Sequence, residues 1–180
     1  LVVHDADAAR TGRVAEAIGA RAAATPKDTV SNAGILVTML PNSASVERVL
    51  DGEDGALAGL SKGALIVDMS SGVPEATRAI AGRAAARGIA MIDAPISGGV
   101  SRAKTGELAI MAGGEATAID RAEPALKAMG SSIIRTGPIG SAHAMKALNN
   151  LVSAGGFLIG IEALLIGKRF GLDPALMVDV

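Results

Sequence analysis

The chain has 180 residues, of which 49% are hydrophobic, and a formal net charge of −1. This charge gives no electrostatic reason to expect nucleic acid or an anionic membrane as a partner. The absence of cysteine excludes disulfides, thiolate catalysis and cysteine-based metal sites. With only two histidines, far apart in the sequence, we also expect no resident metal.

The first 139 residues predict strands and helices in alternation. Leu1–Val3 is an apolar strand before a helix over 8–18, and Ile35–Met39 is a strand ended by Pro41. Further strands are expected at 22–24, 65–67, 89–92, 108–111 and 132–134, with helices after Pro26, through Val46 and Leu50, at 74–87 and at 117–129. Apolar runs separated by helical stretches predict an α/β fold, a doubly wound sheet with helices on both faces.

From residue 140 onward the pattern becomes helical. We expect one long helix from Ser141 to Phe170 and the start of another after Pro174, so residues 140–180 would begin a second, all-helical domain. The apolar stretch Leu151–Gly167 contains Glu162 and is short for a membrane span. Since Leu1–Asp5 reads as a strand rather than a secretory signal, a soluble cytoplasmic protein is the expectation.

Asp5 stands where a dinucleotide-binding unit places an acid. In such a unit an acidic residue at the end of the second strand binds the ribose, and a glycine-rich loop lies about 20 residues earlier. No G-x-G-x-x-G occurs in the chain, so this loop and the first strand are expected to precede Leu1. Asp5 would repel a 2′-phosphate and favour NAD over NADP, whereas Arg10 and Arg13 keep NADP open. Asp5 could instead cap the following helix, a role that Asp7 fills as well.

Two short segments predict a site for a small acid. Ser97, Gly98 and Gly99 follow an apolar strand and offer a hydroxyl and side-chain-free backbone amides, a cradle suited to a carboxylate. The alternative is a simple turn, in which the glycines supply positive φ angles. Lys146 and Asn150 lie four residues apart on a predicted helix, so both side chains leave the same face. Together these residues indicate an enzyme acting on a small hydroxy acid.

Two other polar residues have more than one interpretation. Ser71 lies at the carboxyl end of a predicted strand, where open α/β sheets bind ligands, but it could equally cap the helix at Pro74. His143, three residues before Lys146, could face a substrate or cap the start of its helix.

With these residues in view, the chain resembles the β-hydroxyacid dehydrogenases, the family of 3-hydroxyisobutyrate dehydrogenase and tartronate semialdehyde reductase. The resemblance runs from Val3 to Pro174. Its most specific parts are Asp93-Ala94-Pro95-Ile96-Ser97-Gly98-Gly99 and Lys146-Ala147-Leu148-Asn149-Asn150. It implies a Rossmann-type dinucleotide-binding domain over 1–139, incomplete at its start, followed by a long interdomain helix and the start of an all-α domain over 140–180.

The resemblance also implies roles for individual residues. Lys146 would be the catalytic general acid or base, Asn150 a substrate-contacting amide, and Ser97, Gly98 and Gly99 the substrate-carboxylate site. The cofactor NAD, or NADP, would contact Asp5, Met39, Leu40, Pro41, Ser45 and Ser71. His143 departs from the hydroxyisobutyrate-type pattern, where glutamine is usual, and matches the related 6-phosphogluconate dehydrogenases.

The implied reaction interconverts a small 3-hydroxy acid and its semialdehyde by hydride transfer, in a homo-oligomer, dimer or tetramer. An imine reductase on the same scaffold is one alternative, although the resemblance associates that activity with other residues at the position of Lys146. A non-catalytic cofactor-binding or oligomerisation module is the other. Retention of Lys146, Asn150 and the Ser97–Gly99 turn favours catalysis.

Overall fold

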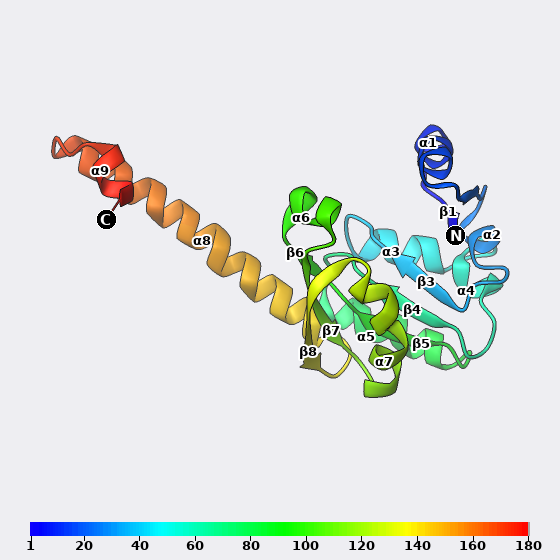
Figure 1. Cartoon of the computed structure of the whole chain (residues 1–180). Coiled ribbons are helices and arrows are strands. Elements are labelled where there is room, and N and C mark those ends of the chain that lie inside the picture. The colour runs from blue at the N-terminus through cyan, green and yellow to red at the C-terminus, as the bar shows by residue number, and fades with distance from the viewer. Residues whose placement is uncertain (180) are drawn as a thin grey trace. The chain divides into compact units, whose positions relative to one another are not determined.

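A computed structural model describes residues 1–179. The chain divides into two compact units, Leu1–Met145 and a second unit from Lys146 onward. Figure 1 shows the helices and strands of both units.

The first unit contains two sheets. β1 (Val2–Val3) and β2 (Arg21–Ala22) form a parallel pair joined by α1 (Ala8–Ile18). The second sheet runs in the order β3-β4-β5-β7-β6, and β8 pairs with β7. Its strands are β3 (Ile35–Thr38), β4 (Leu65–Asp68), β5 (Ala90–Asp93), β6 (Ile96–Ser97), β7 (Leu108–Gly113) and β8 (Gly130–Gly137). The strands β3, β4 and β5 are parallel, whereas β7 runs antiparallel to β5 and β6 and parallel to β8.

Helices cover both faces of the larger sheet, as the alternation of apolar runs predicts. The central strand β4 is buried along its whole length. Ile66 packs into one core with side chains of α3 (Ser43–Leu50), α4 (Ala56–Gly59) and α5 (Pro74–Ala85). Leu65 and Val67 point to the other face, into a core completed by α7 (Ala116–Lys127). Alternate residues of one strand thus serve two cores, which makes this a doubly wound α/β unit.

Local signals in the sequence place several helix starts. Thr25 accepts a hydrogen bond from the backbone N–H of Asp28 at 3.1 Å and caps α2 (Pro26–Thr29), with Pro26 in its first turn. Asn42 caps α3 in the same way. Three short elements were not predicted from the sequence: α4, β6 and α6 (Gly99–Thr105). They span four, two and seven residues, too few for hydrophobic periodicity to reveal them.

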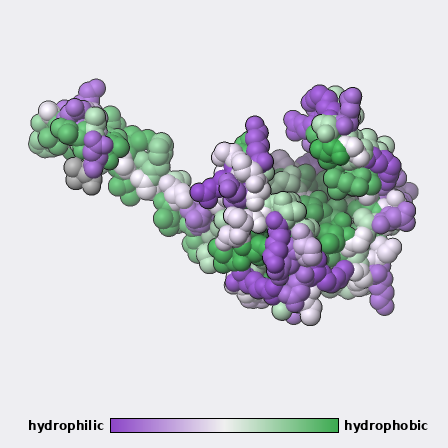
Figure 2. All heavy atoms as spheres, viewed as in Figure 1, coloured by the Kyte–Doolittle hydropathy of each residue, from purple (hydrophilic) through white to green (hydrophobic). Residues whose placement is uncertain are grey.

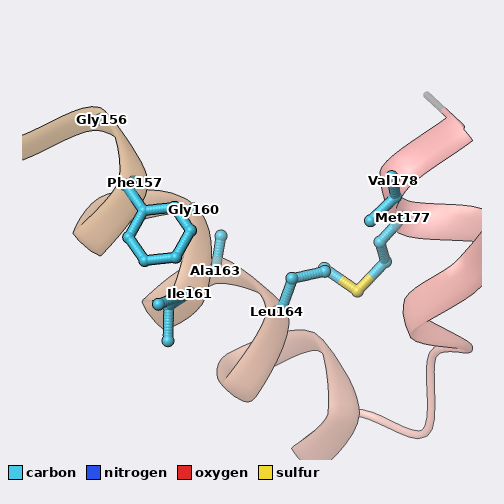
Figure 3. A pocket seen from close by; sticks show the side chains of 8 residues that line it. All are labelled: Gly156, Phe157, Gly160, Ile161, Ala163, Leu164, Met177 and Val178. Carbon is cyan, nitrogen blue, oxygen red and sulfur yellow. The ribbon is translucent and has the colours of Figure 1, made fainter. Parts of the chain in front are cut away.

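The second unit contains most of α8 (Ser141–Arg169) and α9 (Pro174–Asp179). It carries exposed apolar side chains, among them Phe157, Ile159 and Phe170, which give it the green surface of Figure 2. Figure 3 shows a groove of about 430 Å³ in this unit, lined by glycines and apolar residues of α8 together with Met177 and Val178. Within residues 1–179, α8 is the one helix that is long and apolar enough to cross a membrane. One such helix is weak evidence for a membrane span, because the core helix of a soluble protein passes the same test.

Candidate active site

The carboxyl ends of β3, β4 and β5 lie at one edge of the sheet. Thr38 is in register with Asp68, and Asp68 with Asp93. Ligands of open α/β sheets bind outside this edge. Met39-Leu40-Pro41 and Ser70-Ser71 directly follow the neighbouring strands β3 and β4, whereas Ser97-Gly98-Gly99 begins at the end of β6, which pairs with β7.

Hydrogen bonds tie the first two of these segments together. The Asp68 carboxylate accepts from the Thr38 hydroxyl at 2.9 Å and from the backbone N–H of Ser70 at 3.1 Å. The Ser70 hydroxyl accepts from the backbone N–H of Leu40 at 2.9 Å. Asp68 and Ser70 are both buried, whereas the neighbouring Ser71 is exposed. The buried pair therefore fixes the backbone, and Ser71 remains free to contact a ligand.

Ser71 does not cap α5. The N-cap of that helix is Val73, without a side-chain cap bond, and the backbone N–H of Val73 donates to the Ser43 hydroxyl at 2.8 Å. This finding removes the capping alternative for Ser71. Its role toward the cofactor stays a prediction.

The predicted cofactor residues after β3 form an accessible rim. The Met39 side chain is 60% exposed, Pro41 is exposed, and Leu40 is half-buried. Ser45, in the first turn of α3, accepts a hydrogen bond from Arg48 at 3.2 Å. These residues are accessible beside the start of α3, and their contact with the adenosine side of the cofactor stays a prediction.

Asp5, after β1, has the properties of a hydroxyl acceptor. Its carboxylate accepts from the backbone N–H of Asp7 at 2.8 Å and lies 3.5 Å from the Arg10 guanidinium. The Asp7 N–H, with a smaller contribution from Arg10, lowers the pKa of the Asp5 carboxyl. Asp7, not Asp5, caps α1 by accepting from the backbone N–H of Arg10. Asp5 is thus ionised and not used as the helix cap, which fits a group that binds ribose hydroxyls.

The Ser97–Gly99 segment is more than a turn, because Ser97 ends β6 and Gly99 begins α6. Gly98 has φ +132° and Gly99 φ +64°, a conformation that favours glycine at both positions. The Arg102 side chain lies against Gly98: a Cβ added there would be 2.8 Å from the Arg102 Cδ. Arg102 was not predicted from the sequence, although its spacing of one helical turn from Gly98 was a usable signal.

The start of α8 is attached to the end of β5. The Asp93 carboxylate, which is fully buried, accepts from the backbone N–H of Gly140 and of His143, both at 2.8 Å. Asp93 therefore caps a helix that begins nearly fifty residues later in the chain. His143 is 1% exposed. Its ring is hydrogen-bonded inside the first unit, which leaves neither of the two predicted alternatives, facing a substrate or capping the helix by its side chain.

Lys146 and Asn150 both lie on α8, four residues apart as predicted, with Lys146 half-buried and Asn150 exposed. They belong to the second compact unit, whereas Ser97, Gly98 and Gly99 belong to the first. A joint site of these five residues therefore stays a prediction. Within residues 1–179, no three His, Asp or Glu side chains gather as a metal site would require.

A mostly parallel sheet covered on both faces, with polar segments at its carboxyl edge, defines a Rossmann-type nucleotide-binding unit. Residues 1–137 match the family model described as the NAD binding domain of 6-phosphogluconate dehydrogenase. Residues 140–180 match the NAD-binding model of NADP-dependent 3-hydroxyisobutyrate dehydrogenase. The chain belongs to the β-hydroxyacid dehydrogenase family, whose cofactor is NAD or NADP.

Individual relatives agree with this assignment. The chain is 37% identical to NAD-dependent L-serine dehydrogenase of Pseudomonas aeruginosa over 164 residues, which cover 91% of this chain and 55% of that protein. It is 38% identical to 3-hydroxyisobutyrate dehydrogenase of the same organism over 163 residues, 90% of this chain and 54% of the relative. The chain thus spans about half the length of the curated relatives it matches.

Solved structures give the same result. Mycobacterium tuberculosis 3-hydroxyisobutyrate dehydrogenase with L-serine superposes with a TM-score of 0.86 at 32% identity, covering 93% of this chain and 56% of the other. An imine reductase from Myxococcus stipitatus has a TM-score of 0.87 at 22% identity, covering 99% of this chain and 61% of the other. At that identity the likeness shows the fold alone.

Proposed function

We propose that the protein is an NAD(P)-dependent oxidoreductase that interconverts a small 3-hydroxy acid and its semialdehyde. One observation supports the proposal: inside the first unit, the buried Asp93 carboxylate accepts a hydrogen bond from the backbone N–H of His143, at the start of α8. The Ser97–Gly99 segment follows Asp93 by four residues, and the helix that Asp93 caps carries Lys146 three residues after His143. The residues proposed to bind the substrate and to transfer the proton thus each follow, along the chain, a residue of this hydrogen bond.

Each proposed residue has a distinct task. The Ser97 hydroxyl and the backbone N–H groups of Gly98 and Gly99 bind the substrate carboxylate. The nicotinamide, when bound, takes the hydride from the carbon that bears the hydroxyl. Lys146 Nζ accepts the hydroxyl proton in that direction and returns it in the reverse reaction. Asn150, on the same helix face, orients the substrate oxygen.

For the cofactor, we propose NAD over NADP because an ionised Asp5 attracts ribose hydroxyls and repels a 2′-phosphate. The proposed contacts are Asp5 on the ribose, Met39, Leu40, Pro41 and Ser45 on the adenosine side, and Ser71 near the nicotinamide ribose. Arg10 lies within 3.5 Å of Asp5 and keeps NADP as the alternative.

The substrate class follows the relatives. L-Serine and 3-hydroxyisobutyrate, for which two relatives are named, both carry a hydroxyl on the third carbon of a carboxylic acid. The Arg102 side chain lies against Gly98, in the segment proposed to bind the substrate carboxylate. Within residues 1–179 no ion pair of Arg102 is found, so its positive charge would favour a carboxylate there. We propose a small 3-hydroxy acid as the substrate.

For the whole protein we propose a cytoplasmic homo-oligomer. The support is family membership and the apolar surface of the second unit, where Phe157, Ile159 and Phe170 are 70%, 73% and 82% exposed. Surfaces of this kind are usually covered by protein. Light scattering of the whole protein would reveal a monomer if this proposal is wrong.

The test of the reaction is formation of reduced nicotinamide by the whole protein with NAD and a panel of 3-hydroxy acids. Lys146→Ala should lower kcat at least about a hundredfold, the lower range for a lost proton-transfer group, and leave NAD binding intact. Lys168→Ala, an exposed lysine of the same helix, is the matched control and should keep its activity. NAD binding without turnover of any acid would contradict the proposal and support the imine reductase or the non-catalytic module.

A further inference from the structure

The imidazole of His143 is enclosed in the first unit, and both of its nitrogens have partners. Nε2 lies 3.0 Å from the carbonyl oxygen of Ser70, and Nδ1 lies 2.7 Å from the Thr77 hydroxyl. Because a carbonyl oxygen can only accept, Nε2 carries a proton and donates it to Ser70. Nδ1 shares the second hydrogen bond with the Thr77 hydroxyl, whose oxygen also lies 3.0 Å from the Val73 carbonyl oxygen.

Steric contacts restrict the ring further. A Cβ added to Gly72 would lie 2.8 Å from both Cε1 and Nδ1 of the ring, so a larger residue at this position would displace the imidazole. The ring is thus held between Gly72 and Thr77 while its backbone N–H is held by Asp93. A buried polar side chain with every group paired has one favourable orientation, because any other leaves donors or acceptors unpaired.

The partner on the Nε2 side belongs to the proposed cofactor edge. Ser70 immediately precedes Ser71, and the Ser70 hydroxyl accepts from the backbone N–H of Leu40 at 2.9 Å. Ser70, in the segment after β4, thus contacts His143 of α8 through its carbonyl oxygen and Leu40, in the segment after β3, through its hydroxyl. Lys146 follows His143 by three residues on α8, within one helical turn.

We infer that His143 is a positioning residue: it holds the Ser70-Ser71 segment against the first turn of α8, from which the chain continues to Lys146. This inference rests on the proposed function of Ser71 and Lys146, and assigns to His143 no contact with substrate or cofactor. Its consequence is that loss of the Nε2–H donor should change cofactor binding and turnover, and not only the stability of the fold.

The experiment compares three variants of the whole protein. His143→Leu has a similar volume but neither donates nor accepts; His143→Gln keeps a donor and an acceptor on one side chain. Leu126→Ala, at a fully buried apolar residue of α7 that has no hydrogen-bonding side chain, controls for lost stability. For each variant, the melting temperature, kcat, KM for NAD and Kd for NADH are measured at a temperature where all are folded.

We expect His143→Leu to lower kcat by roughly ten- to a hundredfold, the range for groups misplaced by about 1 Å, and to weaken NADH binding. His143→Gln should restore most of both, and Leu126→Ala should lower only the melting temperature. Equal kcat and equal NADH affinity in His143→Leu and Leu126→Ala would overturn the inference.

If the wild type binds NADH but oxidises no 3-hydroxy acid, the proposed function fails. NADH affinity then still decides on His143: weaker binding in His143→Leu alone supports the inference, and equal binding overturns it.

Discussion

The backbone N–H of His143 donates to the buried carboxylate of Asp93 at 2.8 Å, across fifty positions of sequence. Asp93 ends β5, and His143 lies in the first turn of α8. The relationship joins the strand that leads into the Ser97–Gly99 segment to the helix that carries Lys146.

The first prediction concerns this link. Asp93→Asn keeps the size of the side chain but replaces one acceptor oxygen with an NH₂ group that faces a backbone N–H of Gly140 or His143. We expect the free energy of unfolding to fall by about 1–3 kcal/mol, the cost of a buried hydrogen-bonding group left unpaired. Urea denaturation measures it. Asp120→Asn, on an exposed ion pair with Arg135, should cost less than about 1 kcal/mol, and equal losses in both variants would contradict this account of Asp93.

A second prediction concerns Gly113, at the end of β7. A Cβ at this position would lie 2.6 Å from the Asp93 Oδ1 and 2.8 Å from the Ser141 hydroxyl. We expect Gly113→Ala to destabilise the fold by about 1–3 kcal/mol and to speed hydrogen exchange at the start of α8, because the helix must move away from Asp93. Gly12→Ala, inside α1 with nothing within 4 Å, is the control. An unchanged rate of hydrogen exchange at the His143 amide in Gly113→Ala would show that α8 can start in place without the space beside Gly113.

The third prediction tests the acid-binding segment. Gly98 has φ +132°, so Gly98→Ala should cost about 1–3 kcal/mol of backbone strain and raise KM for the hydroxy acid more than KM for NAD. Gly82→Ala, in the middle of α5 with open space around it, should be neutral or stabilising by about 0.5–1 kcal/mol. Steady-state kinetics with each substrate varied in turn separate the two KM values. A rise in KM for NAD alone would assign the segment to the cofactor.

A fourth prediction concerns Asp5 and coenzyme choice. Asp5→Asn should raise KM for NAD about tenfold or more, by loss of a charged acceptor, and improve the use of NADP relative to NAD. Asp7→Asn removes the same charge two residues away but keeps a side chain able to cap α1, so its coenzyme preference should not change. An equal shift in both variants would indicate a general charge effect instead of a ribose contact.

The lowered pKa of Asp5 adds a pH test of this prediction. A carboxyl with a lowered pKa stabilises the folded chain above its unfolded-state pKa and loses that contribution as the pH falls through the acid range. Asp5 therefore stays ionised at neutral and mildly acidic pH. Its contribution to NAD affinity is measured by the ratio of the Kd for NAD of Asp5→Asn to that of the wild type. This ratio should be constant from about pH 8 to about pH 5.

Much of the fold and of the candidate site could be predicted from the sequence, because the signals are local. The helix expected over 8–18 is α1, and the strand at 65–67 lies within β4. Apolar runs and cap residues act over a few positions, so they can be recognised from the sequence alone. The positive φ angles of Gly98 and Gly99 were predictable in the same way, since glycine is the residue that adopts them at little cost.

What the tertiary structure alone decided are relationships between residues far apart in sequence. Neither alternative predicted for His143 holds, and its neighbours in sequence could not show this, because its partners Thr77 and Ser70 lie 66 and 73 residues away. That Asp93 caps α8 was equally hidden. A buried polar group takes whichever partner the packing brings within hydrogen-bonding distance, and packing depends on how the strands and helices pair in space, which no local pattern encodes.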